Sequence, residues 1–209
     1  MHQRGVEIEK NKARAVLEAK PPQTKKELQR FLGQVNYLRR FISNLAGKTK
    51  EFSDLLKLRQ QAEFKWEERH QCAFDKIKNY LSKPPVLISP REGVPLRLYI
   101  SDTNESIGCL LAQNNTSGHE QAIYYLSKIL TPTEVKYSFI EKLCLTLYFA
   151  CIKLRHYLLK HRVYVISQTD LMKYMLNRPA LSGKIGKWLL SLIEFSIVYL
   201  LVYCTRSII

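Results

Sequence analysis

Apolar and polar residues alternate with the spacing of helices in the first third of the chain. Apolar side chains recur three or four positions apart from Leu28 to Ile42, which predicts one amphipathic helix. Thr24 and Glu27 form a capping-box sequence in front of it, because the threonine hydroxyl can accept a backbone N–H and the glutamate can reach back. A second helix is expected over residues 67–82, and the two prolines that follow would end it.

The pattern changes at the proline-rich segment 85–93, where we expect a boundary between a helical part and an α/β part. Three short runs typical of strands come next, and they read PLRLYIS, IGCLLAQ and EQAIYYLS. Polar turns separate these runs, which predicts a meander of three strands. A long helix is expected over 133–159, because its apolar positions form an unbroken stripe, and a fourth strand is expected over 162–167.

The apolar run at 188–204 allows two interpretations. It approaches the length of a membrane span, but Glu194 would then place a carboxylate in the middle of the bilayer at a high cost in free energy. We favour a buried helix at 182–193 followed by a buried strand at 195–203, which is rich in β-branched and aromatic residues. With a short helix near Asp170, the order becomes β-β-β-α-β-α-β, an α/β fold with a mixed five-stranded sheet.

Charge narrows the possible partners, because 33 Lys and Arg residues outnumber 18 Asp and Glu residues and give a formal net charge of +15. Nucleic acid is the natural partner of such a surface, and the alternative is a basic protein that is merely soluble. The cysteine count is 5 and no Cys-x-x-Cys occurs, so neither a disulfide framework nor a zinc site is indicated. We expect an intracellular chain, cytoplasmic or nuclear, with no signal peptide.

Long specific motifs run through both parts of the chain. The helical part contains FLGQVNYLRRFI at 31–42, followed by a tryptophan-containing stretch, an Ala-Phe helix and PPVL. The α/β part contains YSFIEKLCLTLYFACIKLRHYLL and VISQTDLMKYML. Together these segments resemble the Pol polyprotein of gypsy-type LTR retrotransposons, with a sequence closest to plant elements, over residues 5–200.

The resemblance implies a reverse transcriptase thumb and connection region at residues 1–90 and an RNase H-like domain at 91–209. The family's activity is RNA-directed DNA synthesis with hydrolysis of RNA in RNA–DNA hybrids. The polymerase palm lies upstream in the family and its aspartates are absent here, so we expect no polymerisation by this chain alone. The implied partners are RNA–DNA hybrid or duplex nucleic acid and the rest of the polyprotein, without a membrane.

RNase H chemistry uses two divalent cations, and the expected ion, Mg²⁺, prefers oxygen ligands. By resemblance, Glu141 on the long helix and Asp170 after the fourth strand correspond to two of the four family carboxylates. They would be the catalytic and metal-binding residues. Each also has an ordinary interpretation, since Glu141 can be a solvated side chain and Asp170 can cap a helix.

The other two carboxylate positions depart from the family pattern. Counting back seven residues from Gly108 puts Ser101 where the family has its metal-bridging aspartate. Because side chains alternate along a strand, Asp102 should point to the other face or into the turn, unless a bulge rotates it inward. No acid follows Glu194, so the last carboxylate is also missing. We therefore expect a C-terminally truncated domain that keeps the fold without the cleavage chemistry.

Nucleic-acid binding does not require the missing carboxylates. The candidate phosphate-binding residues lie outside the apolar stripe of the helical part: Lys25, Lys26, Arg30, Arg39, Arg40, Lys48 and Lys50. A second basic stretch, interleaved with aromatic residues, reads KLRHYLLKHR at 153–162. Solvated helix faces are the ordinary alternative. Three functions remain: a catalytically defective fragment that binds nucleic acid, which we favour, an active Mg²⁺-dependent RNase H, and a non-catalytic structural remnant.

Overall fold

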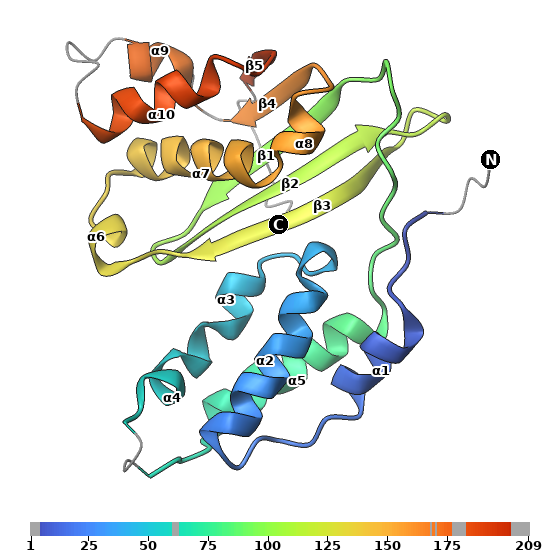
Figure 1. Ribbon diagram of the computed structural model, residues 1–209, viewed down its shortest axis with the longest axis vertical. Helices are drawn as coiled ribbons and strands as arrows, with labels where there is room; N and C mark the ends of the chain where they lie inside the picture. Colours follow the sequence, from blue (N-terminus) through green and yellow to red (C-terminus); the bar gives the residue numbers. More distant parts are fainter. Residues whose placement is uncertain (1–4, 60–62, 168, 170, 177–182, 202–209) are drawn as a thin grey trace.

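The computed structural model describes residues 5–59, 63–167, 169, 171–176 and 183–201. Figure 1 shows a helical part, formed by the first third of the chain, below a five-stranded sheet, and a second group of helices above the sheet. The architecture is the α/β class that the sequence predicts. Of the described residues, no helix is both long enough and apolar enough to cross a membrane.

The helical part is built around α2 and α5. Its elements are α1 (Lys10–Leu17), α2 (Lys25–Tyr37), η1 (Arg39–Phe41), α3 (Leu45–Thr49), η2 (Lys50–Phe52), α4 (Ser53–Lys57) and α5 (Glu68–Ser82). The predicted capping box is only half formed. Glu27 N donates to Thr24 Oγ1 at 3.2 Å, but Glu27 Oε2 accepts from Gln23 N at 2.8 Å and not from Thr24 N. The helix expected to reach Ile42 stops earlier, at Tyr37, and continues as the short 3₁₀ turn η1.

The apolar stripes of α2 and α5 face each other and form a core of their own. Phe31 and Phe74 lie with ring centroids 4.7 Å apart, and Leu28, Val35 and Ile77 are completely buried around them. Each such side chain contributes about 1.5–3 kcal/mol by leaving water. The helical part therefore has a hydrophobic core separate from the one between the sheet and the helices α7 and α10.

The sheet has the predicted five strands. They are β1 (Leu96–Asp102), β2 (Ser106–Asn114), β3 (Glu120–Ile129), β4 (Val163–Ser167) and β5 (Ile197–Leu201), in the spatial order β3-β2-β1-β4-β5. β1, β2 and β3 pair antiparallel, whereas β4 and β5 run parallel to β1. The predicted β-β-β-α-β-α-β order and the mixed sheet are confirmed.

The helices above the sheet are α6 (Pro132–Val135), α7 (Phe139–Lys153), α8 (Arg155–Leu158), α9 (Leu171–Leu176) and α10 (Lys184–Leu192). The prediction of one helix over 133–159 is wrong, because Ser138 starts a new helix as its N-cap and Leu154 ends it. α7 is buried nearly all round, since it lies between the sheet and α10.

The apolar run that begins at residue 188 forms the end of α10 and then β5, so its described residues take the helix-and-strand form. The expected burial of this strand is wrong in part. Val198 and Leu200 keep 39% and 42% of their surface exposed. The reason is that β5 is an edge strand, and these two side chains alternate with Ile197 and Tyr199, which pack against the core.

Contacts at the other edge strand, β3, join the two parts of the chain. Ala46 N of α3 donates to Ser127 Oγ at 2.9 Å, and Ile88 N donates to Ala122 O at 2.9 Å. Lys50 forms an ion pair with Glu105 in the turn between β1 and β2. The helical part is therefore held against the sheet by backbone and side-chain bonds that are distant in sequence.

Candidate functional site

The ends of β1 and β4 and the start of α7 lie on the same side of the sheet (Figure 1). β1 and β4 are parallel, with Tyr99 beside Ile166, so their carboxyl ends lie next to each other at one end of the sheet. We call this end of the sheet the carboxyl edge. This is the region where the resemblance places the carboxylates of an RNase H site. The structure describes the ends of β1 and α7 there, whereas Asp170 lies outside the described residues.

Asp102 points toward α7, and Ser101 points away from it, so the expectation that Asp102 would point to the other face is wrong. The register pairs Ser101 with Gly108 and Asp102 with Ile107 without a shift, so no bulge interrupts this part of the strand pair. Asp102 therefore shares its face with Leu98, which is buried in the core that α7 covers. Ser101 Oγ lies over Gly108, 3.6 Å from where a Cβ would stand.

Lys142, which no motif in the sequence indicated, lies at the same place. It is only 8% exposed, and its Nζ donates to Asn104 O at 3.2 Å, just past the end of β1. Burial raises the pKa of the Asp102 carboxyl, and the positive charge of Lys142 opposes this shift without cancelling it. An ammonium group of the chain itself therefore supplies the positive charge beside Asp102.

Glu141 has a local structural role at the start of α7. Its Oε2 accepts from Ser138 N and from Ser138 Oγ, each at 3.0 Å, and its own N donates to Ser138 Oγ at 3.4 Å. These bonds form a capping box that satisfies backbone N–H groups at the helix start. The family position thus carries a side chain that the helix itself uses.

The described residues at this edge do not fit a site for two Mg²⁺ ions. Hard divalent cations need several converging oxygen ligands, and nowhere in the described ranges do three or more His, Cys, Asp or Glu side chains gather in a metal-binding arrangement. A buried ammonium beside Asp102 also repels a cation from the one half-buried carboxylate of β1.

The candidate phosphate-binding residues divide into two groups. Four of them are engaged within the chain. Lys25 donates to Leu58 O at 2.6 Å, Lys48 donates to Ser43 O at 2.6 Å, and Lys50 pairs with Glu105. Burial also lowers the pKa of the Lys48 ammonium.

Arg40, the fourth engaged residue, reaches Ile123 O at 3.5 Å, and its guanidinium lies 5.5 Å from the ring centre of Tyr124. Lys26, Arg30 and Arg39 are exposed, and no hydrogen bond or ion pair links their side chains to other described residues. These three are the ones whose charges face solvent freely.

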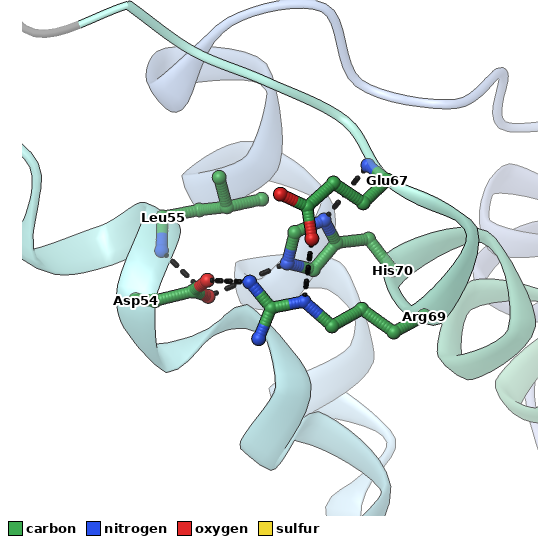
Figure 2. A network of polar contacts seen from close by, with 5 residues as sticks. All are labelled: Asp54, Leu55, Glu67, Arg69 and His70. Atoms are coloured by element: carbon green, nitrogen blue, oxygen red, sulfur yellow. Dashed lines mark hydrogen bonds and ion pairs between the residues drawn. The ribbon is translucent and has the colours of Figure 1, made fainter.

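A buried histidine is the centre of a second polar cluster, shown in Figure 2. His70 has no exposed surface; its Nδ1 accepts from Glu67 N at 3.0 Å, which leaves Nε2 to donate to Asp54 Oδ1 at 3.4 Å. Arg69 bridges Glu67 and Asp54 at 2.8 and 2.5 Å. Burial favours the neutral carboxyl, but the Leu55 N–H, the charge of Arg69 and the hydrogen bond from the His70 ring hold the pKa of Asp54 below its ordinary value.

This His70 cluster resembles a catalytic dyad only in composition. Both ring nitrogens are occupied, and the ring lies 5.5 Å from Trp66 and 6.3 Å from Phe52 in an aromatic core. A substrate has no access to a fully buried ring. The cluster therefore fixes the start of α5 against α4.

Residues 66–165 match the family described as an RNase H-like domain found in reverse transcriptase. The Pol polyprotein of transposon 297 from Drosophila melanogaster is 30% identical over 191 residues, which are 91% of this chain and 18% of that protein. The Tf2-3 polyprotein of Schizosaccharomyces pombe is 32% identical over 143 residues, or 68% of this chain and 11% of that protein. The chain thus spans less than a fifth of the length of these relatives.

Solved structures share the fold. A foamy viral protease-reverse transcriptase in complex with RNA/DNA hybrid superposes with a TM-score of 0.81 and 24% identity, over 98% of this chain and 28% of that one. The same kind of enzyme in complex with dsDNA gives a TM-score of 0.79 and 22% identity, over 97% and 43% of the two chains. At this identity the likeness establishes the fold alone. The chain is therefore related, over 91% of its length, to part of retrotransposon Pol polyproteins, and residues 66–165 match an RNase H-like domain of reverse transcriptase.

Proposed function

We propose that the chain is the thumb and connection region (1–90) and the RNase H-like domain (91–209) of a gypsy-type, plant-like LTR retrotransposon Pol protein. In this proposal it binds RNA–DNA hybrid or duplex nucleic acid and does not cleave it. The observation that supports binding without cleavage is the buried Lys142 ammonium beside Asp102, at the edge where the family assembles its metal ions.

The exposed face of α2 is the surface that fits a duplex best. Lys26 and Arg30 are four residues apart and therefore lie on one face of the helix, without partners in the described part of the chain. Tyr37 continues this face at 66% exposure, and the Lys12 ammonium lies 5.5 Å from its ring centre. Such a row of charges around an exposed aromatic ring suits the phosphates and sugars of a duplex.

The relatives support this partner. The foamy viral enzyme that shares the fold was solved in complex with RNA/DNA hybrid and with dsDNA.

Of the seven candidate phosphate-binding residues, three remain available to bind a duplex: Lys26, Arg30 and Arg39. The other four, Lys25, Arg40, Lys48 and Lys50, already have partners within the chain. An active Mg²⁺-dependent RNase H is the second candidate, favoured only by the orientation of Asp102 toward α7.

Hybrid binding is tested by fluorescence anisotropy with a labelled RNA–DNA hybrid over a range of salt concentrations. Each phosphate contact adds about 0.9 to the slope of log affinity against log salt. Lys26→Gln/Arg30→Gln should therefore lower the magnitude of that slope by about 2 and weaken binding.

The matched control is Lys76→Gln/Lys83→Gln, which removes the same charge from exposed positions on and after α5. This control should retain most of the affinity. Equal losses in the two variants would mean that net charge, rather than the α2 face, accounts for binding. An affinity independent of salt would refute the proposed phosphate contacts and favour the third candidate, a structural remnant.

A further inference from the structure

The fold brings two basic segments that are far apart in sequence to one surface. The Arg40 guanidinium of η1 lies 5.5 Å from the ring centre of Tyr124 on β3. The Tyr124 ring centre is 6.3 Å from that of Tyr157 on α8, and the Tyr157 and His156 ring centres are 4.1 Å apart. These four side chains form a continuous row across the edge strand, which we call the Arg40–His156 strip.

Unpaired positive charges flank α8 in the sequence, next to the His156 end of the strip. Lys153, Lys160 and Arg162 are exposed, and their side chains have no ion pair or hydrogen bond with other residues that the structure describes. Arg155 is different, because it pairs with Glu194. No acidic residue occurs in the sequence between Glu141 and Asp170, so the charge of this segment is not balanced locally.

The same segment of the chain also exposes apolar side chains next to these charged residues in sequence. Ile152 and Leu159 keep 44% and 45% of their surface exposed, and the exposed His156 lies between them in sequence at spacings of four and three. The dipole of α7 would favour a positive charge at Lys153 alone, since Lys160 and Arg162 come after α8. A helix-dipole explanation therefore accounts for only one of the three charges.

A duplex offers phosphates and sugars to a protein surface, whereas an unpaired strand also offers the faces of its bases. The exposed His156 ring and the exposed apolar side chains among cations match the second ligand, because bases stack on a ring while cations bind the backbone. We propose that the Arg40–His156 strip, with Lys153, Lys160 and Arg162, binds a single-stranded segment of RNA or DNA. This site is separate from the duplex surface on α2.

The test measures binding of the full chain to a labelled oligothymidylate of about 12 nucleotides, within the site sizes of known single-strand binders. Lys153→Gln/Lys160→Gln/Arg162→Gln should lower the slope of log affinity against log salt by about 2 and the affinity at 0.1 M salt by about 100-fold, from about 0.7 per contact. His156→Ala should weaken binding at least about fivefold through lost stacking. Circular dichroism establishes that each variant is folded.

The matched control Lys57→Gln/Lys76→Gln/Lys83→Gln removes three exposed positive charges elsewhere and should leave oligothymidylate binding nearly unchanged. An equal loss in this control, or no measurable binding by the unmodified chain, would overturn the proposal. Hybrid binding is measured on the same proteins. If Lys26→Gln/Arg30→Gln leaves hybrid binding intact while the strip variants lose the single strand, the α2 proposal fails and the strip proposal stands.

Discussion

Substitutions in the capping box at the start of α7 distinguish a structural role of Glu141 from a catalytic one. Ser138→Ala removes the hydroxyl that accepts from Glu141 N and that also donates to Glu141 Oε2. Loss of a serine N-cap costs about 1 kcal/mol. For a chain of this size, about 1 kcal/mol lowers the melting temperature by about 2–4 °C.

Glu141→Gln should behave differently from Ser138→Ala. A glutamine amide oxygen can still accept from Ser138 N, because glutamine also occupies this capping-box position. The interaction of the charge with the helix dipole is lost, about 0.5 kcal/mol. Glu141→Ala should lose both, about 1–1.5 kcal/mol.

Thermal unfolding followed by circular dichroism measures all three variants. Equal melting temperatures for Ser138→Ala and the unmodified chain would refute the capping role. A Glu141→Gln variant less stable than Ser138→Ala would contradict the predicted order of stabilities.

Three further predictions follow from buried polar groups. Lys142→Met should lower the free energy of unfolding by about 2 kcal/mol, since a charge-assisted bond to Asn104 O is lost; a denaturant titration that finds no change would contradict this. Because the pKa of Asp102 is raised, its ionisation opposes folding as the pH rises, so Asp102→Asn should raise the melting temperature more at pH 7 than at pH 4, and the opposite order would refute the shift. Burial raises the pKa of the Cys151 thiol to about 12, so iodoacetamide at pH 8 should modify the exposed Cys72 and leave Cys151 unreacted until the chain unfolds, as peptide mass mapping would determine.

The periodicity of apolar residues was sufficient to predict the order of strands and main helices along the chain, because each buried face repeats in sequence with the period of its element. It was insufficient where a local signal interrupts a continuous stripe. The helix predicted over 133–159 includes Ser138, whose S-x-x-E sequence instead starts a new helix by satisfying its first N–H groups. The same kind of signal starts α2 at Thr24, so this break was predictable.

The candidate site could be predicted only in part, because its geometry depends on contacts between distant segments. Alternation along β1 separates Ser101 from Asp102, but only the packing of α7 decides which face is covered. Lys142 gave no signal of its own, since its partner Asn104 lies 38 positions away. Likewise, nothing in the stripe of α2 indicates that Lys25 bonds to Leu58 O, whereas Lys26 remains exposed.

The central claim, binding without cleavage, is tested most directly by one assay that measures both in the same reaction. The full chain is incubated with a doubly labelled RNA–DNA hybrid and Mg²⁺ or Mn²⁺, and anisotropy and the cleaved fraction are recorded together beside Glu141→Gln. We predict salt-dependent binding with no cleavage by either protein. Cleavage by the unmodified chain that disappears in Glu141→Gln would contradict the account, because it would mean that Glu141 and its neighbours assemble a working two-metal site.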